Sequence, residues 1–204
     1  MRRVLMIMFG TLDGIAEFPD YGAEPGAAAE EPEDPMWNPR MDSIDTLLLG
    51  RQAYVAWAGF WPAQKNEPSS SKWAKKFSRF ADGAEKVVFS KTLKSADWPN
   101  SRIVRGDIRE EVERIKKLPG KDMALGGGPR MAQSFLAQDL VDELLIEVFP
   151  SLVGSGKPLF KVKSDPDHAA DVVPLGAPGR QDFKLLESKP LKDGTLFLHY
   201  RRNR

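Results

Sequence analysis

The segment DMALGGGPRM (residues 122–131) joins a short apolar run to a helical-looking stretch through three consecutive glycines. Glycine loses more conformational freedom on folding than any other residue, so three in succession are costly. Two explanations are open: the backbone makes a turn that only glycine allows, or a ligand comes close to that backbone. Pro129 suits the first turn of a helix, because its missing N–H would be unpaired there. Free N–H groups at such a helix start also bind phosphate.

Two further junctions repeat this arrangement. LLLGRQAY (47–54) runs from an apolar segment through Gly50 into a helical stretch, and Arg51 lies at its first turn. VFSKTL (88–93) places a hydroxyl, a cation and a second hydroxyl directly after another apolar segment. Taken singly, the first is better explained as a solvated arginine and the second as an ordinary loop. Since ligands of parallel α/β sheets bind outside the carboxyl ends of the strands, the three together favour a ligand with several phosphates.

The order of apolar and amphipathic segments predicts an α/β domain with a largely parallel sheet and helices on both of its faces. The segment 107–118 places Ile108, Val112, Ile115 and Leu118 at helical spacing, with Asp107 as a plausible N-cap. A second amphipathic helix is expected over 71–81. The apolar runs expected to form strands are 4–9, 46–49, 86–89, 102–104 and 123–125.

The C-terminal part changes character and predicts an antiparallel end to the sheet. ELLIEVF (Glu143–Phe149) alternates in polarity, and two further strand-like runs flank residues 189–194. The Asp193-Gly194 pair there is a hairpin signal. Residues 1–204 are expected to form one domain. Two stretches, 17–39 and 161–181, receive no assignment.

Composition excludes several classes of function. The 204 residues include 30 basic and 29 acidic ones, a balance without the electrostatic footprint of a protein that binds nucleic acid or an anionic membrane. The absence of cysteine excludes disulfides and thiolate ligands, and two histidines argue against a multi-histidine metal site. The apolar run at 4–9 is too short for a secretory signal or a membrane span, so a cytoplasmic protein without a metal is expected.

The motifs LDG (12–14), GRQAY, VFSKTL, LGGGPRM and VDELLIEVFPSLVGSGKPLF (141–160) occur in an order that resembles the reductase domain of the bifunctional riboflavin-biosynthesis deaminase-reductase. The resemblance covers nearly the whole chain and implies a dihydrofolate reductase-like fold. The zinc signature of the deaminase cannot be built without cysteine, so a stand-alone relative is expected. The family implies a homodimeric, NADPH-dependent reductase of a small heterocyclic or sugar-derived carbonyl or imine, similar to 5-amino-6-(5-phosphoribosylamino)uracil reductase.

The resemblance also implies which residues bind the cofactor. Ser90 and Lys91 match positions near the adenosine 2′-phosphate, which favours NADPH over NADH. A cis peptide bond is expected between Gly126 and Gly127 if the chain keeps the one found in dihydrofolate reductases. The full set of implied cofactor residues is Thr11, Ile15, Ala16, Gly50, Arg51, Gln52, Ala53, Ser90, Lys91, Leu125, Gly126, Gly127, Gly128 and Arg130. Ala53 departs from the threonine that dihydrofolate reductases often carry.

Residues on the substrate side are less well defined by sequence. A planar heterocycle could stack on Trp37, whereas Tyr54 and Trp57, at helical spacing, are expected in the core. Asp13 is a candidate catalytic residue that could orient substrate, although an Asp-Gly turn explains it equally well. The substrate candidates are Asp13, Trp37, Gly154 and Lys157.

No proton donor can be named from the sequence. The acids that follow the first strand lack a convincing helical context; they are Glu30, Glu31, Glu33, Asp34 and Asp42. His199 is expected to be structural and His168 to be solvated. The alternative to a reductase is therefore a non-catalytic or orphan NADP-binding protein that retains the fold.

Overall fold

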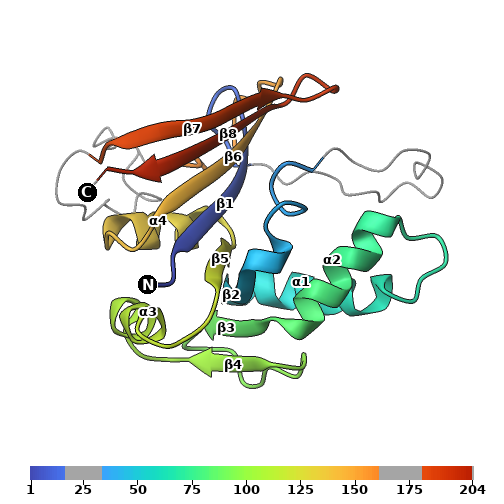
Figure 1. Ribbon diagram of the computed structural model, residues 1–204, viewed down its shortest axis with the longest axis vertical. Coiled ribbons are helices and arrows are strands. Elements are labelled where there is room, and N and C mark those ends of the chain that lie inside the picture. Colours follow the sequence, from blue (N-terminus) through green and yellow to red (C-terminus); the bar gives the residue numbers. More distant parts are fainter. Residues whose placement is uncertain (17–33, 161–180, 204) are drawn as a thin grey trace.

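The computed structural model describes residues 1–16, 34–160 and 181–203. Its centre is a sheet of eight strands in the order β4-β3-β2-β5-β1-β6-β8-β7 (Figure 1). Strands β1 to β6 pair in parallel, whereas β8 pairs antiparallel with both β6 and β7. The strands are β1 (Val4–Thr11), β2 (Ile44–Gly50), β3 (Glu85–Phe89), β4 (Ser101–Val104), β5 (Asp122–Gly126), β6 (Glu143–Phe149), β7 (Phe183–Pro190) and β8 (Leu196–Arg202).

The helices cover both faces of this sheet. Figure 1 shows α1 and α2 on one face and α3 and α4 on the other. The helices are α1 (Arg51–Gln64), α2 (Lys72–Gly83), α3 (Ile108–Lys116) and α4 (Pro129–Ala137), and a 3₁₀ turn, η1 (Met41–Ser43), precedes β2. The predicted architecture, a mostly parallel sheet with helices on both faces and an antiparallel C-terminal end, is confirmed.

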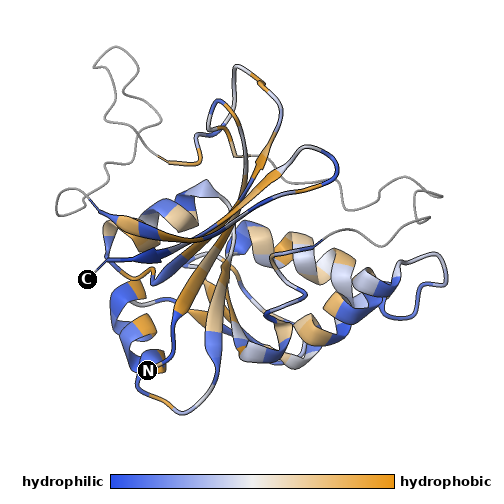
Figure 2. Cartoon of the chain, turned by 45° about the horizontal axis from the view of Figure 1, so that its top comes forward, coloured by the Kyte–Doolittle hydropathy of each residue, from blue (hydrophilic) through white to orange (hydrophobic). Residues whose placement is uncertain are grey.

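The central strand β1 shows why the sheet needs both helical layers. All eight of its residues are buried, as the apolar run predicts. Successive side chains point to opposite faces: Leu5, Ile7 and Phe9 join the core beneath α1 and α2. Val4, Met6 and Met8 join the core beneath α3 and α4. Figure 2 shows these hydrophobic central strands between the two helical layers.

The start of α3 agrees with the sequence prediction, whereas its end does not. The Asp107 carboxylate accepts a hydrogen bond from the Glu110 N–H, which confirms the predicted N-cap. Leu118, predicted on the apolar stripe of this helix, is 45% exposed because α3 ends at Lys116. The Leu118 N–H bonds to the Ile115 carbonyl, a tighter turn that rotates Leu118 off the stripe.

The hairpin predicted at Asp193-Gly194 is also confirmed. The Leu191 N–H bonds to the Thr195 carbonyl and the Gly194 N–H to the Leu191 carbonyl. Gly194 has a φ of 86°, a left-handed value that favours glycine. This turn joins β7 and β8.

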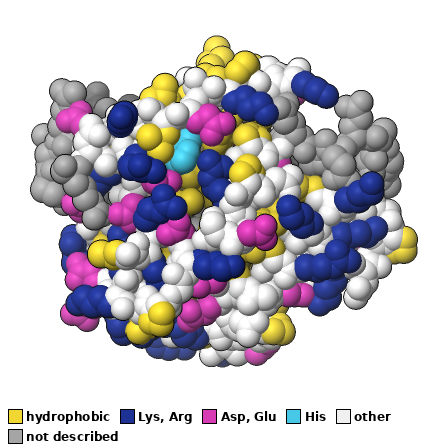
Figure 3. All heavy atoms as spheres, in the orientation of Figure 1, with side chains coloured by type: hydrophobic (Ala, Val, Ile, Leu, Met, Phe, Trp, Pro, Cys, Tyr) yellow, Lys and Arg dark blue, Asp and Glu magenta, His cyan; other side chains and the backbone are white. Residues whose placement is uncertain are grey.

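The surface carries both signs of charge. On the face shown in Figure 3, acidic and basic side chains are interspersed with hydrophobic ones. Within residues 1–16, 34–160 and 181–203, no helix has the length and apolar character required to cross a membrane.

Candidate functional site

A cavity of about 1030 Å³ opens at the carboxyl ends of β1, β2 and β5, where ligands of parallel α/β sheets bind. Its walls come from the starts of α1 and α4, the glycine run between β5 and α4, and aromatic side chains of both α1 and α2. The lining residues are Ile7, Phe9, Ala16, Trp37, Gly50, Arg51, Gln52, Ala53, Ala56, Trp57, Phe60, Trp61, Trp73, Phe77, Ile108, Gly126, Gly127, Gly128, Pro129, Arg130, Met131, Ser134 and Lys157.

The first glycine of the run is explained by close packing within the chain. A Cβ on Gly126 would lie 3.0 Å from Cη2 of Trp57, whereas one on Gly127 would lie 3.4 Å from Cβ of Met131, an ordinary van der Waals contact. Neither residue is among those with a positive φ. All peptide bonds of the described residues are trans, so the expected cis bond between Gly126 and Gly127 is wrong. The approach of the Trp57 ring accounts for glycine at 126 with the ordinary trans geometry.

The third glycine has no such explanation. Gly128 has a φ of −72°, which any residue adopts, and no atom lies within 4 Å of the position of its missing Cβ. Gly50 is similar, with a φ of −82° and its nearest such contact at 3.9 Å. Both residues line the cavity. Their lack of a side chain keeps the backbone open toward the cavity.

These two glycines are the N-caps of α4 and α1, and no side chain caps either helix. The other two helices differ, because the side chains of Ser71 and Asp107 accept hydrogen bonds at the starts of α2 and α3. The first N–H groups of a helix have no partner within it, and the helix dipole is positive there. Among the four α-helices of the described chain, the two that begin at the cavity thus leave these groups available to an anion.

Three cations line the same cavity: Arg51, Arg130 and Lys157. All three side chains belong to exposed residues, and none forms an ion pair within the described residues. Arg51 is the first residue of α1, and Arg130 is the second of α4. The cations therefore add to the positive field of the two bare helix starts.

Lys157 is brought to the cavity by the pairing of two loops. The Ala16 N–H bonds to the Lys157 carbonyl at 2.8 Å, and Ile15 forms an isolated bridge with Pro158. Asp13 fastens the same loops together, since its carboxylate accepts hydrogen bonds from the Thr11 hydroxyl and from the Gly154 N–H at 2.8 Å. These bonds, the Thr11 bond foremost, lower the pKa of Asp13. Asp13 itself does not line the cavity.

The Ser90-Lys91 turn adjoins the cavity without lining it. The turn follows Phe89, the last residue of β3, which pairs with Gly50 at the end of β2. It therefore lies at the same edge of the sheet as the start of α1, one strand away. The Ser90 hydroxyl accepts hydrogen bonds from the Thr92 and Leu93 N–H groups. Lys91 is exposed and forms no ion pair within the described part of the chain.

Sequence reasoning missed Arg105 beside this turn. Its guanidinium donates to the Lys91 carbonyl at 3.1 Å and to the Leu93 carbonyl at 2.8 Å. These bonds hold the turn in place, and the Arg105 guanidinium places a second cation beside Lys91. The only signal in the sequence is that Arg105 directly follows the predicted strand at 102–104.

The structure thus brings most of the predicted site residues together. Those that line the cavity are Ala16, Trp37, Gly50, Arg51, Gln52, Ala53, Gly126, Gly127, Gly128, Arg130 and Lys157. Those that do not are Thr11, Asp13, Ile15, Ser90, Lys91, Leu125 and Gly154. Leu125 is buried in the core and Thr11 is the buried last residue of β1, whereas the others lie in the turns that follow β1, β3 and β6. The acids Glu30, Glu31 and Glu33 and His168 lie outside the described residues.

An aromatic wall is the main feature that the sequence did not reveal. Trp61, Trp73 and Phe77 line the cavity together with Trp37 and Trp57. Phe77 lies at the centre of this wall, with ring centroids 4.9 Å from Trp37 and 4.5 Å from Trp61. The expectation that Trp57 belongs to the core is therefore only partly right, because its half-buried ring also faces the cavity, whereas Tyr54 is buried as expected.

Asp34 positions the start of this wall. Its carboxylate accepts hydrogen bonds from the N–H groups of Met36, Trp37 and Asn38 and from the Trp73 indole. With four donors bound to it, Asp34 anchors the turn that carries Trp37 and ties that turn to α2. Trp37, proposed from sequence as a substrate wall, is held at the cavity by these bonds.

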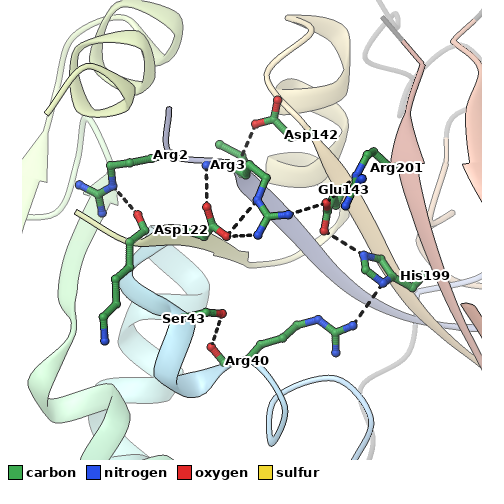
Figure 4. A network of polar contacts seen from close by, with 11 residues as sticks. Arg2, Arg3, Arg40, Ser43, Asp122, Asp142, Glu143, His199 and Arg201 are labelled. Atoms are coloured by element: carbon green, nitrogen blue, oxygen red, sulfur yellow. Dashed lines mark hydrogen bonds and ion pairs between the residues drawn. The ribbon is translucent and has the colours of Figure 1, made fainter. Parts of the chain in front are cut away.

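A polar network lies on the α1/α2 face at the amino ends of β1, β5 and β6 (Figure 4). Glu143 is at its centre and contacts Arg3, Arg201 and His199, each at 2.9 Å. His199 also contacts Arg40, which stands over the Phe197 ring. This is the structural role expected for His199. In the part of the chain that the structure describes, no group of three or more histidine or acidic side chains could hold a metal ion.

Comparison with known proteins identifies the family. The profile of the RibD C-terminal domain matches residues 2–195. The uncharacterized protein YyaP of Bacillus subtilis is 34% identical over 160 residues, which are 78% of this chain and 80% of that protein. A putative riboflavin biosynthesis protein from Shewanella sp. PV-4 superimposes with a TM-score of 0.69 at 19% identity over 99% of each chain.

A more distant neighbour has the same fold. Dihydrofolate reductase from Enterococcus faecalis, solved in complex with NADP(H), has a TM-score of 0.56 at 13% identity, over 99% of this chain and 97% of that one. The chain belongs to the RibD C-terminal domain family.

Proposed function

We propose that this protein is an NADPH-dependent reductase that transfers a hydride to a small carbonyl or imine compound. The observation that carries the proposal is the pair of bare helix starts at Gly50 and Gly128, where neither backbone geometry nor packing requires glycine. Such sites suit the phosphates of a dinucleotide. Family membership and the dihydrofolate reductase-like neighbour support a reductase-like role.

In this proposal each part of the cavity, and the Ser90-Lys91 turn beside it, has a distinct task. The N–H groups at the starts of α1 and α4, with Arg51 and Arg130, bind the pyrophosphate. The Ser90-Lys91 turn, with Arg105, binds the 2′-phosphate one strand further along. The aromatic wall holds the acceptor flat and keeps water away from its reacting face. When bound, NADPH supplies a hydride to the acceptor carbon, and a proton from water goes to the oxygen or nitrogen, because none of the described residues that line the cavity is acidic.

Gly128→Val will weaken NADPH binding at least about tenfold, because the new side chain covers the N-terminal N–H groups of α4. The variant is expected to fold, since φ is −72° and the space around the Cβ position is empty. Isothermal titration calorimetry measures the dissociation constant directly.

Gly59→Val is the matched control for this substitution. Gly59 also has no atom within 4 Å of its Cβ position, but it lies in α1 away from the cavity lining. Its NADPH affinity should equal that of the unmodified protein. Equal affinities for Gly128→Val and Gly59→Val, or no binding of NADPH to the unmodified protein, would refute the proposal.

Lys91→Glu will weaken NADPH much more than NADH, because it places a negative charge beside the 2′-phosphate. The expected loss is about tenfold or more for NADPH and about twofold or less for NADH, since charges near a protein surface interact by about 1–4 kcal/mol at 4 Å. Calorimetry with both nucleotides at fixed salt gives the ratio. An equal loss for both would mean that the 2′-phosphate does not lie at this turn.

A second candidate function, an NADP-binding protein without turnover, is favoured because the cavity lining within residues 1–16, 34–160 and 181–203 includes no acidic residue. One measurement distinguishes the two functions. Oxidation of NADPH is followed by its absorbance across a panel of quinones, pterins and pyrimidines. Binding of NADPH with no oxidation by any of them would favour the second function.

A further inference from the structure

A row of cations runs along one side of α2. We call it the basic stripe, and it consists of Lys72, Lys75, Lys76 and Arg79. These residues are three or four positions apart, so their side chains are neighbours on the helix surface. The opposite side of α2 carries Trp73 and Phe77, which are buried and line the cavity. Figure 3 shows basic side chains gathered where Figure 1 places α2. The even balance of charge in the whole chain therefore conceals an uneven distribution.

The basic stripe opposes the formation of its own helix. Like charges three or four residues apart on a helix repel, and every cation of the stripe has such neighbours. Cations near the amino end of a helix also meet the positive end of its dipole. Lys72 is the first residue of α2, and the first turn contains no acidic residue that would offset it.

α3 shows the arrangement that helix stability favours. Its first turn contains Glu110 and Glu111, and its last turn contains Arg114 and Lys116. Arg114 pairs with Glu111 at 2.7 Å. In α2 the cations lie on the side away from the core, so packing does not explain them. A feature that weakens a helix and that packing does not require indicates a function.

The residues bonded to the stripe do not neutralise it. Lys76 donates to Oδ1 of Asn38 at 3.1 Å, and Lys75 donates to the Pro68 carbonyl at 3.2 Å, so both acceptors are uncharged. Neither of these lysines nor Arg79 forms an ion pair with any residue in 1–16, 34–160 or 181–203.

Two acidic residues lie close to the stripe in the sequence. Glu67 is exposed in the loop before α2, and hydrogen bonds from Ser69, foremost, and the charge of Lys75 lower its pKa. The Asp82 carboxylate is bonded to Lys65 at 2.5 Å. One exposed carboxylate therefore faces the whole stripe from these positions, and an excess of positive charge remains.

The surroundings of the stripe favour an acidic peptide over other anionic partners. Nucleic acid without sequence preference binds through exposed rings on which bases stack, whereas Trp73 and Phe77 are buried and Phe80 is half-buried. A helix that lies on a membrane presents apolar side chains beside its cations, and the stripe contains none. Carboxylates need only the cations themselves.

The spacing also suits a peptide. Residues four positions apart on α2 are separated by about 6 Å along the helix axis. Alternate side chains of an extended chain point the same way and are separated by about 6.6 Å. An extended peptide with an acidic residue at every second position thus places one carboxylate near each cation along the stripe.

We propose that the basic stripe of α2 is a docking surface for an acidic segment of a partner protein. The surface lies on the side of α2 opposite to the rings that line the cavity. The proposal therefore does not depend on the reductase function proposed above.

Two dye-labelled peptides of equal length test the proposal, one of alternating glutamate and alanine and one of alternating glutamine and alanine. Fluorescence anisotropy with the whole protein at low salt should show the glutamate peptide binding at least about tenfold more tightly than the glutamine peptide. Its affinity should fall as salt is added, because the contacts are exposed and salt screens them. Equal affinities for the two peptides would overturn the proposal.

Lys75→Glu combined with Lys76→Glu should weaken the glutamate peptide at least about tenfold. The free energy of unfolding should stay the same or rise, because acidic residues suit the amino end of a helix. Lys184→Glu combined with Lys192→Glu is the matched control, because both lysines are exposed and the net charge changes equally. The control should bind the peptide within about twofold of the unmodified protein. An equal loss in both double variants would mean that only net charge matters, and the proposal would fail.

Three further titrations test other occupants and other sites. Displacement of the peptide by NADPH would mean that it binds the cations of the cavity. Tighter binding of a single-stranded oligonucleotide of equal charge would make the stripe a nucleic acid surface. Peptide binding only after Glu30→Gln, Glu31→Gln and Glu33→Gln would mean that acids of the same chain compete for the stripe. Each of these results would overturn the proposal, and none of them bears on whether NADPH binds.

Discussion

Glu143→Ala will lower the free energy of unfolding by about 3 kcal/mol at pH 7, because it removes the centre of a buried polar network. The Glu143 side chain is 3% exposed and contacts Arg3, Arg201 and His199. Burial would raise the pKa of this carboxyl. Hydrogen bonds from His199 and Arg201, with the charge of Arg3, outweigh burial and lower the pKa to about 2.

The pH dependence follows from the direction of that shift. A carboxyl whose folded-state pKa lies below its ordinary value stabilises the protein fully above that ordinary value, 4.5. The contribution is lost as pH falls from 4.5 through 2. The difference between the unmodified protein and Glu143→Ala should therefore be largest near pH 7 and shrink steadily below pH 4.5.

Urea unfolding at several pH values measures this difference. Glu113→Ala is the control, because Glu113 is exposed on α3 and its pair with Arg109, at 3.7 Å, lies in solvent. An exposed pair of this kind contributes about 0.3–0.5 kcal/mol. If Glu143→Ala costs no more than the control at pH 7, the network of Figure 4 does not stabilise the fold.

The sequence was sufficient for the architecture because the relevant signals are local. The apolar run in β1 predicts a strand covered on both faces, and the structure buries all eight of its residues. Asp107 predicts the start of α3, because its carboxylate accepts a hydrogen bond from the N–H of Glu110, only three positions away. The Asp193-Gly194 turn is local in the same sense. Each of these features is decided by neighbours in the chain.

The cavity depends on contacts that no local pattern contains. Trp73 and Phe77 lie at helical spacing, which equally suits a side chain packed on the sheet and one that faces a cavity. The choice is made by where α2 lies relative to Trp37, which comes from a distant turn held by Asp34. The glycine run shows the same limit, because only the position of Trp57 separates Gly126, which packing explains, from Gly128, which it does not.

Glu147→Gln will raise the free energy of unfolding by about 3 kcal/mol at pH 8, the opposite effect to a change at Glu143. Glu147 lies four residues further along β6 and faces the same side of the sheet. It is 9% exposed, and no described residue donates a hydrogen bond to it. Burial raises its pKa to about 7, and the nearby carboxylates of Asp34 and Asp193 add to that shift.

The sign again follows from the shift. A carboxyl with a raised pKa costs nothing below its ordinary value of 4.5, where it is protonated in both the folded and the unfolded chain. The cost grows as pH rises from 4.5 and is complete above about 7, where the folded protein must hold a buried charge. Glutamine keeps the shape and carries no charge, so the gain should appear over this pH range and vanish near pH 4.

Glu143→Gln is the matched control, since it makes the same substitution on the same strand and face. The unfolding free energies of the two variants should move in opposite directions at pH 8, with Glu147→Gln more stable than the unmodified protein and Glu143→Gln less stable. A loss of stability in both would mean that Glu147 is ionised and paired at neutral pH. Opposite signs would establish that the network of Figure 4 stabilises a buried carboxylate only at Glu143. Four residues further along the same strand, at Glu147, a carboxylate on the same face of the sheet would destabilise the fold.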